Sequence, residues 1–229
     1  MNKLRNRFLV LRLDCGLNDL AENINSNQYT ECKGVGVISG TLDRDIVNAT
    51  FVEKKKVYDE ISYPDGETET IERYKYIYFS FKAQAISDKH YLFQLVNAPV
   101  SIKCFVEFLS KIYPNLAVEK FTFDLQRFHE SIKQDPKVER ARVTSLKASS
   151  LPFSEKSAAK IELFSETDSY RELKRVYGEK GYHLDRLVFK ISSGGGDYEM
   201  LASASGAISY SELLDESIAI ESFVGSISY

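Results

Sequence analysis

Two long runs of β-branched and aromatic residues, joined by a short turn, constrain the fold of this chain more than any other feature. The first run is IVNATFVEKKKVYDEISY (46–63), and the second is ETETIERYKYIYFSF (67–81). Between them stand Pro64, Asp65 and Gly66, residue types that are typical of β-turns. Two strands joined by such a turn pair as a hairpin. The sequence therefore predicts a long β-hairpin.

Further strands and helices are expected on either side of this hairpin. The strand candidates are RFLVLRL (7–13), GVGVISGTL (34–42), YLFQLV (91–96), AVEKFTF (117–123) and KVERARVTSL (137–146). The helix candidates have apolar residues at helical spacing, and they are GLNDLAENI (16–24), VSIKCFVEFLSKIY (100–113) and a segment marked by Leu125, Phe128 and Ile132.

The segment KASSLPFSEKSAAK (147–160) has no strong period, which predicts a domain boundary there. We expect a strand-rich domain over residues 1–147 and a smaller α/β domain over 148–229, with a single domain as the alternative. In the second part KIELFS, DRLVFKIS and YEMLASAS are expected strands, and the pattern leaves residues 208–229 open between helix and strand. The predicted fold class is α+β.

The glycines of ISSGGGDYEM (191–200) could form a phosphate-binding loop or a turn between strands. A phosphate loop needs a helix directly after it, because the helix N terminus supplies the N–H donors. Here a predicted strand follows, so we expect a hairpin. GVGVISG (34–40) fails the same test, and the sequence predicts no nucleotide cofactor.

Catalytic signatures are scarce in this sequence. SAAK (157–160) matches a serine–lysine pair but lacks its companion motifs, and the three histidines have no second ligand at zinc spacing, so we predict no metal and no cofactor. One enzymatic alternative remains, a Mg²⁺-dependent nuclease with Asp45, Glu53 and Lys55, because an acid followed by Glu-x-Lys can hold Mg²⁺ and steady a phosphate.

Two segments could instead form binding surfaces. Strand alternation places Tyr74, Tyr76 and Tyr78 on one face, where they could stack with bases or pack in a subunit interface. The segment from Arg127 to Lys147 is rich in basic residues, and Arg140, Arg142 and Lys147 are candidate phosphate contacts. A solvated charged face is the structural alternative for the second segment.

Composition indicates where in the cell the chain is expected and which partners it favours. The formal net charge of −3 is lower than expected for a protein that coats nucleic acid nonspecifically, although a local basic face is compatible with it. No apolar run approaches the length of a membrane span, and the three cysteines show no paired spacing. The sequence therefore predicts a cytoplasmic protein that does not enter a membrane.

The order KIELFS, helix, DRLVFKIS, glycine-rich gap and YEMLASASGAIS resembles the C-terminal part of phage-exclusion Rex A-like defence proteins. The strand from Asp185 to Lys190, the polar hairpin after it, and Gly206 shortly before Ile208 carry the resemblance. It covers under a third of the chain and transfers no functional residue. The resemblance implies a cytoplasmic sensor that binds DNA and acts through protein partners.

From these observations we predict a non-catalytic binding or sensor protein, with DNA or RNA as a candidate partner. The antiviral element of this prediction comes from the resemblance alone. The alternatives are the Mg²⁺-dependent nuclease and a protein–protein interaction module that forms a homodimer.

Overall fold

The computed structural model describes residues 3–154, 157–178 and 181–228, and its contacts divide the chain into two units. We call residues 8–119 the hairpin unit, and residues 1–7 with 120–229 the C-terminal unit. Strand β1 (Lys3–Arg12) contributes its first residues to the C-terminal unit and its last residues to the hairpin unit. The division therefore differs from the predicted boundary between residues 147 and 148.

Residues 147 and 148 lie inside strand β8 (Arg140–Ser154), which pairs with β9 (Ser157–Phe164). The segment expected to be a boundary therefore forms two long strands, with residues 155 and 156 outside the described part. Register shifts between Ala148 and Leu151 and between Pro152 and Ser154 interrupt the pairing. These irregularities break the two-residue alternation, which is why the sequence showed no period there.

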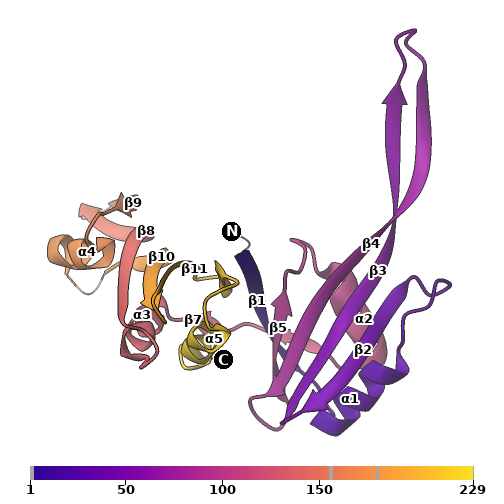
Figure 1. Cartoon of the computed structure of the whole chain (residues 1–229), viewed down its shortest axis with the longest axis horizontal. Coiled ribbons are helices and arrows are strands. Elements are labelled where there is room, and N and C mark those ends of the chain that lie inside the picture. Colours follow the sequence, from indigo (N-terminus) through magenta and orange to yellow (C-terminus); the bar gives the residue numbers. More distant parts are fainter. Residues whose placement is uncertain (1–2, 155–156, 179–180, 229) are drawn as a thin grey trace. The chain divides into compact units, whose positions relative to one another are not determined.

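The hairpin unit is built on a sheet with the strand order β2-β3-β4-β5-β1, and β6 (Ala117–Glu119) also pairs with β1 (Figure 1). The other strands are β2 (Val35–Asp43), β3 (Ile46–Ser62), β4 (Thr68–Ala85) and β5 (His90–Val96). Helices α1 (Leu17–Ser26) and α2 (Lys103–Ile112) pack on one face of this sheet. The strands and helices predicted between residues 7 and 113 are confirmed, whereas the single strand predicted over 117–123 is divided into β6 and a second short strand over 122–123.

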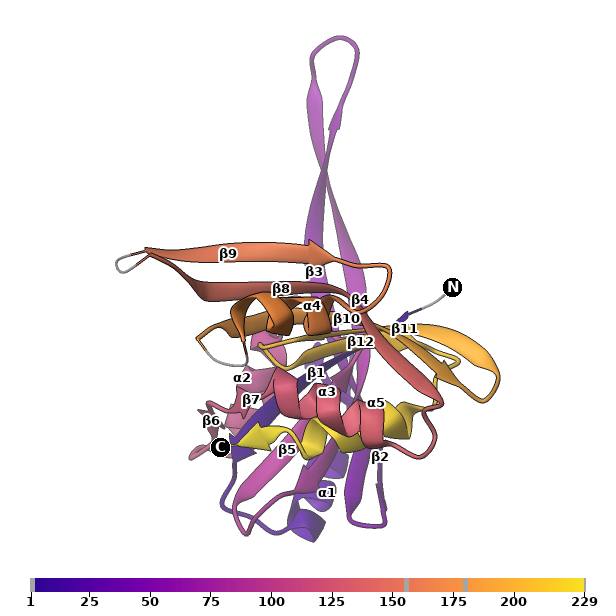
Figure 2. The same cartoon turned by 90° about the vertical axis from the view of Figure 1, so that its left-hand side faces the viewer.

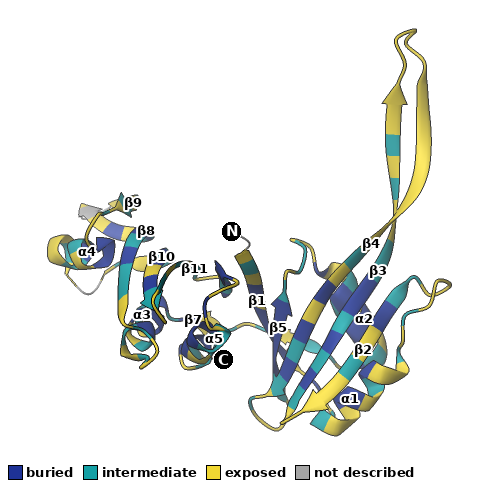
Figure 3. Cartoon of the chain, in the orientation of Figure 1, coloured by how far each residue is buried: buried dark blue, intermediate teal, exposed yellow. Residues whose placement is uncertain are grey.

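Phenylalanine rings fill the space between this sheet and α2. Phe105 of α2 lies with its ring centroid 5.2, 5.3 and 5.1 Å from those of Phe51, Phe79 and Phe81. Phe79 and Phe81 alternate with exposed or half-buried residues along β4, whereas in β3 the neighbour of Phe51, Val52, is buried as well (Figure 3). The buried rings anchor the lower part of the hairpin.

The predicted hairpin is confirmed over its full length. Strands β3 and β4 pair without interruption from Ile46 and Gln84 to Ser62 and Thr68. At the turn, the amide of Tyr63 donates to the carbonyl of Glu67 at 2.8 Å, and Gly66 has a φ of 87°. The end of the hairpin extends beyond the helices and is exposed on both strands (Figures 1 and 3).

The strands of the C-terminal unit follow the order β1-β12-β11-β10-β8-β9 in the sheet (Figure 2). Its other members are β10 (His183–Ser193), β11 (Gly196–Ser203) and β12 (Ala207–Ser211). Every strand pair described in this unit is antiparallel. The unit is therefore α+β rather than the smaller α/β domain expected there, and the chain as a whole is a strand-rich α+β protein.

Three helices accompany this sheet: α3 (Leu125–Gln134), α4 (Ser169–Tyr177) and α5 (Glu216–Val224). Helix α3 packs on β8 and β10 and also contacts α5. The tail that the sequence left open forms β12, α5 and β13 (Ile227–Ser228), and β13 pairs with β7 (Thr122–Phe123). The ring of Phe123 lies 4.6 Å from that of Phe223, so apolar contacts fix the tail beneath the sheet.

The glycine-rich loop is a tight turn between β10 and β11, as predicted. Ser193 pairs with Gly196, which leaves a two-residue loop in which Gly194 and Gly195 have φ values of 55° and 77°. Positive φ at both central residues is the requirement of a type I′ turn, which glycine meets without steric cost.

Among the described residues, no helix is long and apolar enough to cross a membrane.

Candidate nucleic-acid interface

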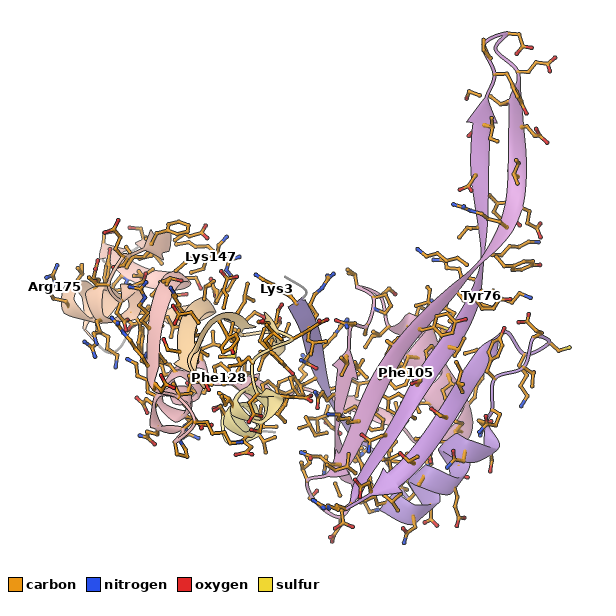
Figure 4. The ribbon with its side chains drawn as sticks, viewed as in Figure 1. Lys3, Tyr76, Phe105, Phe128, Lys147 and Arg175 are labelled. Carbon is orange, nitrogen blue, oxygen red and sulfur yellow. The ribbon has the colours of Figure 1, made fainter. Side chains whose placement is uncertain are left out.

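The sheet of the C-terminal unit has one face against the helices and one open face. On the helix side lie buried side chains of β8 and β10 such as Val143, Leu146 and Phe189, and the ring of Phe189 is 5.9 Å from that of Phe128 in α3. Figure 4 shows Lys147 and Phe128 on opposite sides of this sheet. The open face is therefore the surface that carries Lys147.

A β-bulge decides which residues of β8 lie on the open face. In a regular strand Arg142 and Lys147, five residues apart, would lie on opposite faces. Here the register with β10 shifts between Val143 and Ser145, so Thr144 is an extra residue in β8. As a result Arg140 and Arg142 share the open face with Lys147, so the three predicted phosphate contacts lie along one face of β8.

Basic residues from neighbouring strands extend this open basic face. Arg142 pairs with Lys190 across the β8–β10 ladder, and Lys147 pairs with Arg186. The register of the sheet places these side chains on the open face: Lys3 on β1, Arg140, Arg142 and Lys147 on β8, Lys160 on β9, and Arg186 and Lys190 on β10.

Acidic residues on the same face pair with several of these cations. Glu162 contacts both Lys147, with a Nζ–Oε2 distance of 3.1 Å, and Arg186, with a Nη2–Oε1 distance of 2.7 Å. Asp197 accepts a hydrogen bond from Ser192 Oγ and pairs with Lys190 at 2.9 Å, and these two contacts lower the pKa of Asp197. Those cations are held in place by exposed ion pairs, which contribute little to stability.

Arg140 and Arg142 are arranged differently. Within the described part of the chain Arg140 has no ion-pair partner, and it is exposed. Arg142 donates from Nη1 to the carbonyl oxygen of Glu166, and its charge contributes to lowering the pKa of Asp197. Both residues line a shallow hollow of about 150 Å³ on the open face, together with Lys190, Ser192 and Asp197. These two guanidinium groups are the strongest anion contacts that this face offers.

The tyrosine row of β4 is the second predicted surface, and it lies in the hairpin unit. Tyr74, Tyr76 and Tyr78 share one face of the strand and are 52%, 38% and 54% exposed. The rings of Tyr76 and Tyr78 stack with centroids 6.3 Å apart. Figure 4 shows Tyr76 on the hairpin strand. The prediction that the three tyrosines share an exposed face is confirmed.

Residues that the sequence analysis missed hold these tyrosines in place. Glu31 accepts hydrogen bonds from the hydroxyls of Tyr29 and Tyr76 at 2.9 and 3.0 Å, and it pairs with Lys54 Nζ at 2.6 Å. These contacts, that of Lys54 first, lower the pKa of Glu31. The Lys54 ammonium also lies 4.3 Å from the centre of the Tyr74 ring. No local motif marks Glu31, because it reaches β4 from the loop after α1.

The residues of the nuclease alternative do not form a cluster. Asp45 lies in the two-residue turn between β2 and β3, whereas Glu53 and Lys55 lie far along β3. At about 3.3 Å per residue, Glu53 is more than about 20 Å from the turn. Burial, followed by the charge of Glu53, raises the pKa of Cys104 in α2 to about 11, so Glu53 faces that helix.

The described residues contain no group of three or more His, Cys, Asp or Glu side chains that could hold a metal ion. No protein-family model matches the sequence, and no curated protein is significantly similar to it. The function proposed below therefore depends on the two surfaces just described.

Proposed function

We propose that this chain is a non-catalytic, cytoplasmic protein that binds DNA or RNA through the open basic face of its C-terminal unit. The observation that carries the proposal is the bulge at Thr144, which aligns Arg140, Arg142 and Lys147 on one exposed sheet face. Side chains of this kind bind phosphate oxygens and fix the position of a nucleic acid without reading its sequence.

The distribution of charge within the C-terminal unit supports this role. Four of its acidic residues, Glu212, Asp215, Glu216 and Glu221, belong to α5 and the loop before it, on the helix side of the sheet. Lys137 pairs with Asp215 there, with a Nζ–Oδ2 distance of 3.0 Å. Part of the negative charge of the unit thus lies in α5 and the loop before it, away from the open face, so a chain with a net charge of −3 can still present a positive surface.

The tyrosine row offers a second contact of a different kind. The exposed rings of Tyr74, Tyr76 and Tyr78 could stack with unpaired bases, at about 1–3 kcal/mol for each base. Their orientation is fixed by Glu31 and Lys54 before any ligand binds, which lowers the entropic cost of stacking. We therefore favour single-stranded over double-stranded ligands.

Fluorescence anisotropy with labelled single-stranded and double-stranded oligonucleotides, from low to moderate salt, tests the proposal. We expect the double variant Arg140→Ala/Arg142→Ala to weaken binding. On a single strand, the slope of log K against log salt should become shallower by about 0.7 for each phosphate that is no longer neutralised. The control is Lys103→Ala/Lys111→Ala on α2, which removes the same charge elsewhere. Absence of binding by the unmodified protein at low salt would contradict the proposal.

The proposed cytoplasmic location and the proposed role in phage defence rest on separate observations. Cys15, Cys32 and Cys104 are free thiols, as is usual for proteins of a reducing compartment. A role as a sensor in phage defence depends on the resemblance of the C-terminal element order to Rex A-like proteins. Phage plaque counts on cells that express the chain, with and without the two arginine substitutions, test this role.

The exposed end of the hairpin favours a second candidate function, a homodimer formed through this arm. It exposes the apolar side chains Tyr58, Ile61, Tyr63 and Ile71, which are 61%, 40%, 43% and 41% exposed. A two-stranded ribbon without further packing is only marginally stable in water, and a second copy of the arm would bury these side chains. Light scattering after size exclusion tests this: a dimer that dissociates on Ile61→Asp supports it, and a monomer at all concentrations overturns it.

A further inference from the structure

A cleft beside α4 is lined by charged residues of α4 as well as by residues of β8. Strand β9 pairs with β8 only from Ser145 onward, so the β8 edge from Arg140 to Thr144 has no strand beside it on that side. The chain instead passes this edge in the segment 165–168 and enters α4. The amide of Ser165 and the hydroxyl of Ser169 both donate to the carbonyl of Thr144 at 3.0 Å, which fixes α4 next to the edge.

The cleft between this edge and α4 has a volume of about 450 Å³, within the range of small-ligand sites. Four arginines line it, Arg140 and Arg142 from β8 and Arg171 and Arg175 from α4. Arg171 and Arg175 are one helical turn apart and lie on the same face of the helix. Figure 4 shows Arg175 projecting from α4 into solvent.

These arginines are only partly compensated by carboxylates of the unit: the charge of Arg175 acts on Glu172, and that of Arg142 acts on Asp197. Arg140, Arg171 and Arg175 are exposed and have no ion-pair partner among the residues described in the structure. The cleft is lined by four arginines and three carboxylates, so one positive charge is in excess, and a bound anion would balance it.

Three acidic residues, Glu166, Asp168 and Glu172, line the same cleft, and two of them are held by other donors. Glu172 accepts hydrogen bonds from the hydroxyls of Ser165 and Thr167 at 2.6 and 3.0 Å. Asp168 caps α4 by accepting from the amides of Tyr170 and Arg171, both at 3.1 Å, and it also faces Lys133 at 3.6 Å. Hydroxyl and amide donors thus hold Glu172 and Asp168, and the charge of Arg175 also contributes to lowering the pKa of Glu172. Arg142 gives one N–H to the carbonyl oxygen of Glu166, and the other guanidinium N–H groups of the cleft are available to a ligand.

We propose that this cleft binds a phosphate monoester, the terminal phosphate of a nucleic-acid strand. The planar guanidinium group binds phosphate through paired hydrogen bonds. A monoester carries about −1.5 to −2 charges at neutral pH, more than the single charge of each phosphate within a strand. A site with four arginines therefore selects a strand end over its interior.

The location of Arg140 and Arg142 connects this site to the open basic face. Both line the cleft and also the hollow on the open face that contains Lys190. A strand bound across the open face can thus deliver its end to α4. This inference rests on the proposed nucleic-acid binding, although a free nucleotide would present the same phosphate group.

The test compares one single-stranded oligonucleotide with a 5′-phosphate, a 3′-phosphate or hydroxyls at both ends, by anisotropy. We expect one phosphorylated form to bind about tenfold more tightly than the hydroxyl form. In Arg171→Ala/Arg175→Ala this preference should disappear while the hydroxyl form binds as before. Arg171→Lys/Arg175→Lys should restore part of it, and Lys103→Ala/Lys111→Ala should leave it unchanged.

A second arm titrates a deoxynucleoside monophosphate by calorimetry and so distinguishes the source of the phosphate. Binding of the nucleotide that is lost in Arg171→Ala/Arg175→Ala, without any end preference, supports the cleft with a free nucleotide as its ligand. Equal affinity for all three oligonucleotides, together with no nucleotide binding, overturns the cleft and leaves the proposed function intact. A preference that survives in Arg171→Ala/Arg175→Ala also overturns it. Because both arginines are exposed, the variants are expected to fold, which thermal unfolding checks.

Discussion

The tyrosine row of the hairpin unit and the basic row of the C-terminal unit are both lines of side chains on an exposed strand face. The tyrosines follow strict alternation along β4, with Phe79 and Phe81 buried on the reverse face. The basic row depends on one extra residue, Thr144, that changes the alternation of β8 halfway. The first row is therefore encoded locally, whereas the second exists only because of how β8 pairs with β10.

The two rows also differ in what lies around them. The tyrosines are fixed by Glu31 and Lys54, so their surface is complete without a ligand. Arg140 and the two arginines of α4 have no such partners in the described chain. A surface that is satisfied internally suits stacking or packing, and one with uncompensated charge suits an anionic ligand.

The largest expected effect is that of a substitution in the core of the hairpin unit, the unit that carries the tyrosine row. Phe105→Ala deletes the ring that contacts Phe51, Phe79 and Phe81, and it should lower the free energy of unfolding of the hairpin unit by about 3–5 kcal/mol. Urea denaturation monitored by tyrosine fluorescence measures this. Phe164→Ala, at a ring that is 69% exposed, is the control and should change stability by less than about 0.5 kcal/mol.

Deletion of Thr144 is the corresponding test of the basic row. Without the bulge, either Arg140 and Arg142 or Lys147 must turn toward the helix side, where a charged group would be buried without a partner. We expect a loss of about 3 kcal/mol or more in the C-terminal unit, together with loss of oligonucleotide binding. The substitution Thr144→Ala keeps the bulge and should cost less than about 1 kcal/mol. Equal effects of the two changes would show that the register does not matter.

The pH dependence of stability tests the core of the C-terminal unit, which contains a buried histidine. Beneath the basic row His129 is buried between Tyr170 and Phe189, and this burial lowers its pKa to about 4. The unfolded chain, with an ordinary histidine pKa near 6.5, binds the proton more readily. Stability is therefore complete above about pH 6.5, falls as the pH drops toward 4, and levels off below it.

The total loss from His129 is on the order of 3 kcal/mol. His129→Phe keeps a ring in this site and should remove that part of the pH dependence, measured as the difference between the two proteins in urea denaturation at several pH values. Carboxylates titrate in both proteins and cancel in the difference. An identical pH profile for the two proteins would contradict a neutral buried histidine.

The smallest expected effect is on tyrosine ionisation next to Glu31, the residue that orients Tyr76. Burial, followed by the hydrogen bond to Glu31, raises the pKa of Tyr29. The variant Glu31→Gln removes the negative charge, so tyrosine ionisation, followed by ultraviolet absorbance, should begin at lower pH, with little change in stability. Asp59→Asn, on the outer part of the hairpin, is the control and should leave this ionisation unchanged.

Local chemistry in the sequence determined the long hairpin, its Pro-Asp-Gly turn, the Gly194–Gly195 turn and the shared face of the three tyrosines. Each follows from alternation or from backbone freedom within a few consecutive residues. Only the tertiary structure decided the division of the chain near residue 119, the joining of Arg140 and Arg142 with Lys147, and the cleft that adds Arg171 and Arg175. These features depend on strand register and on contacts between distant segments, and side-chain periodicity does not record either.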